Sequence, residues 1–308
     1  MSSDSESKIL GLRSARELLE MLTAREISSV ELLEHFLERN EALHSQINAI
    51  VTLDIDRAVE SAKASDQRRS ENNAVGELDG LPMTIKDAIA VEGVRSTGGA
   101  IELEDHVPED DAEVVTKVRT AGAVIFGKTN LPRWSGDVQA FNEIFGTTNN
   151  PWKLDCGPGG SSGGASAAVA CGLTAFDIGT DIGGSVRLPA SYCGIMGIRP
   201  THNRITTDGV IPFAPSFDVI GWFASDAKVF EEVGSVLLNQ PTMSLDVKRL
   251  IIAKDTFSRL DTSVNEALKP IIKSLADKFE LTKEINVSQD RLAHWFEIFR
   301  TIQGSEIW

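Results

Sequence analysis

One glycine-rich stretch, residues 157–190, constrains this chain more than any other: GPGGSSGGASAAVACGLTAFDIGTDIGGSVRLPA. It carries two serines flanked by glycine, Ser161 and, 24 residues later, Ser185. Glycine reaches backbone conformations that other residues avoid, and it lets a ligand come close to main-chain N–H groups. Glycines gathered around hydroxyl groups therefore predict a reaction centre on this stretch.

Length and charge limit the kind of protein. The 308 residues suffice for one large α/β domain or two smaller ones. Acidic residues outnumber basic ones by 45 to 30, and the net charge of −15 opposes binding to nucleic acid or anionic membranes. The N-terminus lacks a signal-peptide pattern, and no window reaches the ~18 consecutive apolar residues of a membrane-spanning helix. We expect a cytoplasmic protein without nucleic-acid or membrane partners.

The cysteines indicate neither a disulfide framework nor a zinc site. Cys156, Cys171 and Cys193 form no CxxC pair and leave an odd count. We expect them to be small, buried or half-buried free thiols.

The N-terminal part of the chain, residues 1–75, predicts helices. Residues 14–17 (SARE) and 28–31 (SSVE) fit capping boxes, in which a serine and a glutamate satisfy the free N–H groups at a helix start. Apolar residues then recur at helical spacing, and a polar helix is expected over about residues 54–69.

From Leu81 onward, short apolar runs alternate with a helical pattern. Residues 81–91 (LPMTIKDAIAV) and 122–130 (GAVIFGKTN) predict buried strands, while residues 111–121 between them predict a helix. Strands that alternate with helices indicate an α/β domain with a largely parallel or mixed sheet.

The last helical pattern in the chain carries an apolar stripe. Its members are Leu292, Trp295, Phe296, Phe299 and Ile302. The chain stops soon afterwards at Trp308, so we expect a sequence that is cut short, with part of this stripe left without a packing partner.

Two nucleotide-binding patterns fail in the glycine-rich stretch. Gly159 and Gly164 have the spacing of a phosphate loop, but Ala165 stands where the phosphate-binding lysine belongs. A dinucleotide fingerprint that starts at Gly157 meets Ser162 in place of its last glycine, and no clear strand precedes it.

A third alternative is the nucleophile elbow of the α/β-hydrolases. Residues 159–163 match G-x-S-x-G, but the preceding segment NNPWKLDCGP is turn-like, whereas an elbow follows a strand. The elbow also needs a downstream histidine, for which only His202 and His294 remain.

The string GGSSGGASAAVA…GTDIGGSVRLPASYCGIMGIRPT resembles the signature of the amidase signature family of serine hydrolases, which use a Ser–Ser–Lys triad. Residues 81–87 (LPMTIKD) resemble the strand of that family that carries its catalytic lysine, here Lys86. The resemblance covers most of residues 25–240 and thins out beyond them.

The resemblance implies an α/β amidase-signature fold, a central mixed β-sheet with helices on both faces, incomplete at the C-terminus. It implies one amidase domain over residues 1–308. Its parts would be a helical segment (1–75), a catalytic core with the signature (76–240) and a partial C-terminal portion (241–308).

The resemblance also implies residue roles. Ser185 would be the nucleophile, Ser161 the proton relay after a cis peptide bond, and Lys86 the base, kept neutral by burial. Asp87 would oppose that neutrality, so we expect it to point elsewhere. Backbone N–H groups of the oxyanion hole would come from Ile182, Gly183, Gly184 and Ser185. Supporting roles would fall to Ser162, Thr180, Asp181 and Arg187, the last mainly structural.

The implied activity is hydrolysis of a small-molecule carboxamide to an acid and ammonia or an amine, without metal or cofactor. Whether the chain forms a homodimer stays open. The chain is most similar to general amidases and indoleacetamide-hydrolase-like members. Two alternatives stay open: a catalytically silent or truncated binding module, and the glutaminase subunit of a tRNA-dependent amidotransferase. Against the latter, residues 216–224 (SFDVIGWFA) depart from that subunit's SLDxxGP pattern.

Overall fold

The computed structural model describes residues 10, 13–241, 246–289 and 291–307. The chain divides into two compact units, residues 1–242 and 243–308. The grouping of all 308 residues into one amidase domain stays a prediction.

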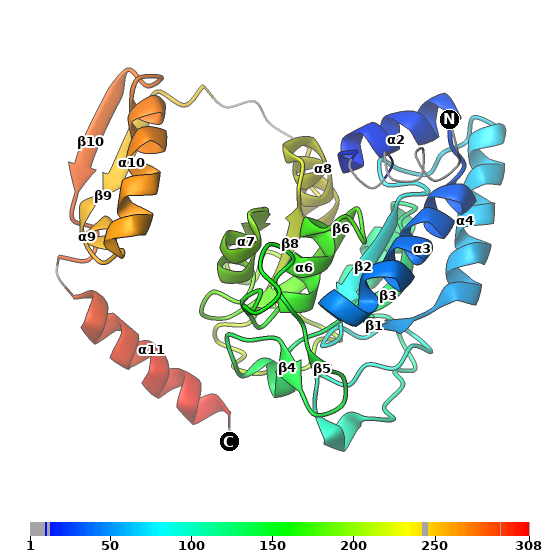
Figure 1. Ribbon diagram of the computed structural model, residues 1–308, viewed down its shortest axis with the longest axis horizontal. Helices are drawn as coiled ribbons and strands as arrows, with labels where there is room; N and C mark the ends of the chain where they lie inside the picture. Colours follow the sequence, from blue (N-terminus) through cyan, green and yellow to red (C-terminus); the bar gives the residue numbers. More distant parts are fainter. Residues whose placement is uncertain (1–9, 11–12, 242–245, 290, 308) are drawn as a thin grey trace. The chain divides into compact units, whose positions relative to one another are not determined.

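The described part of the first unit is built on a six-stranded sheet with the order β1-β3-β2-β6-β8-β7 (Figure 1). The strands are β1 (Ile50–Leu53), β2 (Pro82–Lys86), β3 (Val124–Thr129), β6 (Phe176–Asp181), β7 (Met196–Ile198) and β8 (Val219–Ala224). The central strands β3, β2 and β6 run parallel, whereas the pairs β1–β3, β6–β8 and β7–β8 are antiparallel. The predicted mixed sheet is confirmed.

Helices flank both faces of this sheet, as predicted (Figure 1). They are α2 (Ala15–Ala24), α3 (Ser29–Ile47), α4 (Ile55–Ser70), α5 (Glu113–Thr120), α6 (Gly163–Ala170), α7 (Arg187–Cys193) and α8 (Ala227–Leu238). Two 3₁₀ turns, η1 (Ile101–Leu103) and η2 (Arg133–Ser135), and a small hairpin, β4 (Phe141–Asn142) with β5 (Gly146–Thr147), lie in the long loops.

Both predicted capping boxes are present. The Ser14 and Ser28 hydroxyls accept hydrogen bonds from the N–H groups of Glu17 and Glu31, at 3.2 and 3.1 Å. Each glutamate carboxylate accepts in turn from the backbone N–H of its serine. These reciprocal bonds fix where α2 and α3 begin.

Helix α6 is made of small residues because it lies against backbone. A Cβ added to Gly164 would stand 2.3 Å from the Asn130 nitrogen and 2.7 Å from the Ala49 oxygen. Apart from Ala170, which is half-buried, the residues of α6 are buried. This close approach holds the start of α6 at the carboxyl ends of the central strands.

The second unit contains β9 (Arg249–Ala253), α9 (Lys254–Phe257), α10 (Thr262–Ala276), β10 (Leu281–Ile285) and α11 (Leu292–Glu306). Strands β9 and β10 pair in parallel. Asp255 joins α9 to the chain after β10, because its carboxylate accepts from the N–H groups of Val287 and Ser288.

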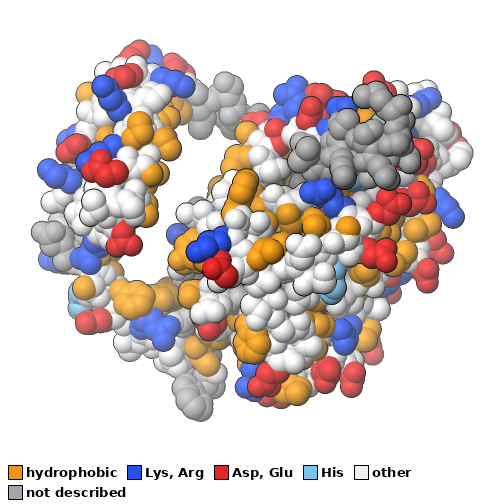
Figure 2. All heavy atoms as spheres, viewed as in Figure 1, with side chains coloured by type: hydrophobic (Ala, Val, Ile, Leu, Met, Phe, Trp, Pro, Cys, Tyr) orange, Lys and Arg blue, Asp and Glu red, His pale blue; other side chains and the backbone are white. Residues whose placement is uncertain are grey.

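The second unit exposes apolar side chains, as expected for the last helical pattern (Figure 2). On α11, Trp295 and Phe296 are 46% and 61% exposed. Trp308, on which part of that expectation rested, lies outside the described residues.

The three cysteines are free thiols, but one is not where we expected it. Cys193 is buried and Cys171 half-buried, whereas Cys156 is exposed. The prediction was wrong for Cys156 because it lies in an external turn, where its N–H donates to Lys153 and its carbonyl accepts from Asn150. In the described ranges, no helix has the length and apolar character to cross a membrane.

Candidate active site

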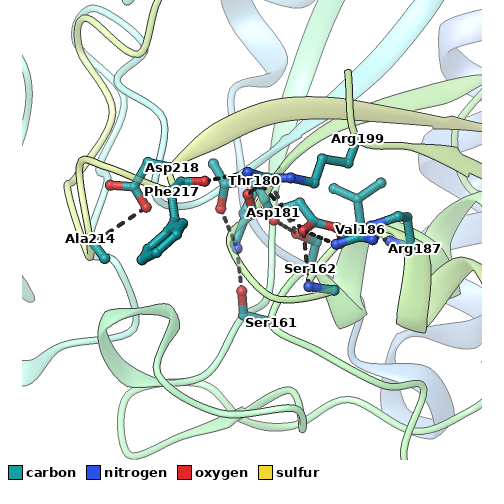
Figure 3. A network of polar contacts seen from close by, with 12 residues as sticks. Ser161, Ser162, Thr180, Asp181, Val186, Arg187, Arg199, Ala214, Phe217 and Asp218 are labelled. Atoms are coloured by element: carbon teal, nitrogen blue, oxygen red, sulfur yellow. Dashed lines mark hydrogen bonds and ion pairs between the residues drawn. The ribbon is translucent and has the colours of Figure 1, made fainter. Parts of the chain in front are cut away.

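Lys86 is the last residue of β2, and its side chain is completely buried. Its ammonium nitrogen lies 2.7 Å from Ser161 Oγ and 2.7 Å from Thr180 Oγ1. Ser161 and Thr180 face each other across this contact (Figure 3). Residues from β2, from the loop before α6 and from the end of β6 thus meet at one point.

The charge on Lys86 is disfavoured by its surroundings. Burial lowers the pKa of Lys86 to about 7, although the carboxylates of Asp181, Asp218 and Asp177 act to raise it. A lysine with this pKa is neutral for much of its time at physiological pH, so it can accept a proton. The expected burial of Lys86 is confirmed.

Asp87, the next residue, faces away from Lys86, as expected. Its carboxylate accepts from the Thr97 backbone N–H at 3.0 Å and from the Thr97 hydroxyl. It also lies 3.9 Å from the ammonium group of Lys128. The Asp87 carboxylate therefore faces Lys128 and not Lys86.

Ser161 and Ser162 occupy the turn that enters α6. The Gly160–Ser161 peptide bond is cis, as the family resemblance implied. Ser162 Oγ donates to the Thr180 carbonyl at 3.2 Å, and its backbone N–H donates to the Ser185 carbonyl at 3.1 Å. Ser162 thereby ties the Ser161 turn to both the end of β6 and the Ser185 loop.

Ser185 lies in the loop between β6 and α7, and its side chain is half-buried. Its carbonyl is the acceptor for Ser162, so the two serine-bearing segments are in contact through the backbone. Among the residues that the structure describes, the Ser185 hydroxyl has no hydrogen-bond partner. It is therefore available to a substrate.

Asp181 organises the Ser185 loop. Its buried carboxylate accepts from the backbone N–H groups of Gly184, Val186 and Arg187, at 2.9, 3.0 and 3.3 Å. The Arg187 guanidinium binds the same carboxylate through two nitrogens, at 3.1 and 2.9 Å (Figure 3). Arg199 lies 3.6 Å from the Asp181 carboxylate and donates to the Asp181 carbonyl.

Although burial raises the pKa of Asp181, the hydrogen bonds from Arg187 and Val186 bring this pKa below its usual value.

The four backbone N–H groups predicted for an oxyanion hole differ in availability. That of Gly184 is engaged by Asp181. Those of Ile182, Gly183 and Ser185 have no acceptor within the part of the chain that the structure describes. These three donors are free to meet a ligand.

Sequence reasoning missed two buried charged residues near the site. Lys128 is completely buried on β3, where it donates to the Ile89 carbonyl and, at 2.6 Å, to Ser96 Oγ. Asp177 is completely buried on β6. The signal for both was a charged residue inside an otherwise buried strand pattern. Over the described residues, no group of three or more histidine, cysteine or acidic side chains could hold a metal ion.

The chain is similar to known proteins over most of its length. A family model described as Amidase matches residues 31–275. A glutamyl-tRNA(Gln) amidotransferase subunit of Heliobacterium modesticaldum is 43% identical over 216 residues, which are 70% of this chain and 44% of that protein. The chain spans about half the length of the curated relatives that it matches.

Solved structures share the architecture. A crystal structure of an amidase matches with a TM-score of 0.87 at 27% identity, covering 96% of this chain and 68% of the other. The peptide amidase of Stenotrophomonas maltophilia matches with a TM-score of 0.83 at 26% identity, covering 96% and 66%.

Proposed function

This chain belongs to the amidase family, and from that premise we propose that it hydrolyses the carbon–nitrogen bond of a small carboxamide through an acyl-enzyme on Ser185. The observation that carries the proposal is the 2.7 Å contact between Lys86 Nζ and Ser161 Oγ in a fully buried setting. A serine hydroxyl is a weak nucleophile, and the buried amine of Lys86, which contacts the Ser161 hydroxyl, would supply the missing base to Ser185 through Ser161.

In the acylation step, Ser185 Oγ forms a bond to the amide carbon while its proton passes to Ser161 and the Ser161 proton passes to Lys86. The carbonyl oxygen becomes an oxyanion, which the free N–H groups of Ile182, Gly183 and Ser185 stabilise. When the carbon–nitrogen bond breaks, the proton returns through Ser161 to the leaving nitrogen, which departs as ammonia or an amine.

Deacylation repeats the same transfers with water. A water molecule attacks the ester carbon as its proton passes through Ser161 to Lys86, and the proton then returns to Ser185 Oγ as the acid leaves. The proton count is restored after each cycle, so the described residues need no external acid or base.

An amide panel tests this proposal. The full chain is incubated with aryl, alkyl and amino-acid amides, and the released ammonia or amine is measured. We expect turnover of at least one amide by the parent and none by Ser185→Ala. A folded parent that hydrolyses none of them would favour the catalytically silent module.

A second candidate function is supported by the relatives. Two curated relatives with 43% identity are named as glutamyl-tRNA(Gln) amidotransferase subunits. One part of the departure at SFDVIGWFA, Trp222 in place of proline, gives little argument against this role, because Trp222 is 3% exposed on β8 and its indole N–H donates to the Phe230 carbonyl at 2.8 Å. The tryptophan fills the core rather than the site.

Glutamine separates the two candidates. An amidotransferase component would hydrolyse glutamine in preference to aryl or alkyl amides, and the addition of its partner proteins would increase the rate. A stand-alone amidase would show neither the preference nor the increase.

A further inference from the structure

Asp177 lies on the same face of the sheet as Lys86. Strands β2 and β6 run parallel, with Thr84 opposite Asp177 and Ile85 opposite Ile178. Side chains alternate between the two faces of a strand, so Thr84 and Lys86 share a face, and Asp177 shares it with them. The N-cap residue of α6 lies on this face, since Ser162 stands where a Cβ on Gly179 would point.

The Asp177 carboxylate is only half satisfied. One oxygen, Oδ2, accepts from the hydroxyls of Thr84 and Thr129, at 2.6 and 3.1 Å. The other, Oδ1, is buried and has no hydrogen-bond partner among the described residues. A fully buried carboxylate normally needs more partners than two hydroxyls to carry a full charge.

The other acids near Lys86 have different partners. Asp181 is paired with Arg187 and Arg199. Asp218, in the loop before β8, accepts from the backbone N–H groups of Phe213 and Ala214.

Asp177 has no arginine partner in the described residues. The cations near it are two buried lysines, Lys86 and Lys128. Lys128 lies opposite Ile85 in the sheet. Its side chain therefore points to the face opposite the one that carries Lys86 and Asp177. Helix α6 contributes no charged side chain to this region.

We propose that Asp177 is a positioning residue for Lys86, and that the charge on its carboxylate, together with those of Asp181 and Asp218, sets how readily Lys86 gives up and takes back a proton. This inference deepens the proposed hydrolase and rests on it for its catalytic meaning. The electrostatic coupling between Asp177 and Lys86, on which the inference depends, can be measured without turnover.

The direction of the coupling follows from the charges. Burial raises the pKa of Asp177 to about 7, while burial lowers that of Lys86 to about 7. Two groups titrate as a pair when their interaction exceeds about one pK unit. An ionised Asp177 favours the ammonium form of Lys86, and a neutral residue at position 177 favours the amine.

Direct titration of Lys86 tests the inference. The full chain is prepared with ¹³C-labelled lysine, and the Lys86 signal is assigned by its loss in Lys86→Met. In Asp177→Asn, we expect the titration midpoint of Lys86 to fall measurably, as for loss of a neighbouring opposite charge. An unchanged or higher midpoint in the folded variant would overturn the inference.

Asp87→Asn is the matched control. Asp87 is equally buried and directly follows Lys86, but its carboxylate faces Lys128. This variant should lower the midpoint of Lys128 and leave that of Lys86 in place. A fall in the Lys86 midpoint as large as in Asp177→Asn would contradict a specific role for Asp177.

Thr84→Val provides a second variant in case Asp177→Asn does not fold. It removes the 2.6 Å hydrogen bond that stabilises the Asp177 carboxylate and keeps the side-chain shape. The Lys86 midpoint should again fall, by less than in Asp177→Asn, and no fall would count against the coupling. The midpoints are read without substrate, so inactivity of the parent on every amide would refute the proposed function and leave this result standing.

Discussion

Lys86 Nζ and Ser161 Oγ lie 2.7 Å apart although 75 residues separate them in the sequence. The contact exists because β2 ends at Lys86 just where the turn into α6 places Ser161. Ser162 then joins this turn to the Ser185 loop. Three separate segments thereby bring Lys86 to the Ser161 hydroxyl and the Ser161 turn to the backbone of the Ser185 loop.

The rate should depend on pH through Lys86. Its pKa is lowered to about 7, and only the neutral amine can take a proton from Ser161. We therefore expect kcat/KM to rise with pH through about 7 and then level off, as measured on one amide across a range of buffers. A rate that falls as the pH rises through this range would exclude Lys86 as the base.

Removal of the relay hydroxyl should cost most of the activity. We expect Ser161→Ala to lower kcat by about 10²–10⁴-fold, the range typical of lost general acid–base catalysis. Ser166→Ala is the control, since Ser166 is buried on α6 and its hydroxyl donates to the Gly163 carbonyl instead. Equal losses in the two variants would point to a packing effect.

The hydrogen bonds to the Asp181 carboxylate should hold the Ser185 loop in the geometry that catalysis needs. Asp181→Asn weakens the bonds that hold Gly184, Val186 and Arg187, so the Ser185 loop should shift. A displacement of this kind costs about 10²-fold in rate.

Arg187→Lys should not preserve full activity, because an ammonium cannot form the bidentate pair. Full activity in both variants, measured as kcat, would show that the loop is held by other contacts.

The sequence predicted those features that depend on local pattern. The capping boxes at Ser14 and Ser28 were readable because both partners lie three residues apart. Burial of Lys86 was readable from its apolar neighbours. The link between Asp177 and Lys86 was not, because it depends on which strands pair and in what register. The engagement of the Gly184 N–H by Asp181 depends likewise on the folded loop.

Close packing of α6 makes a prediction about stability. Gly164→Ala would place a Cβ 2.3 Å from the backbone nitrogen of Asn130, and the backbone has to move. We expect a loss of about 1–3 kcal/mol in the free energy of unfolding, or more, from overpacking. Gly157→Ala is the control, because nothing lies within 4 Å of the added Cβ. Denaturant melts of both variants give the comparison, and equal midpoints would refute the packing argument.

The most direct test of the central claim is the site of covalent modification. The full chain is treated with a fluorophosphonate, which phosphonylates activated serine hydroxyls, and the intact mass and modified peptide are measured. We predict one adduct on Ser185, absent in Ser185→Ala, retained in Ser166→Ala and formed much more slowly in Lys86→Met. An adduct that persists in Ser185→Ala, or no adduct on a well-folded parent, would contradict the account.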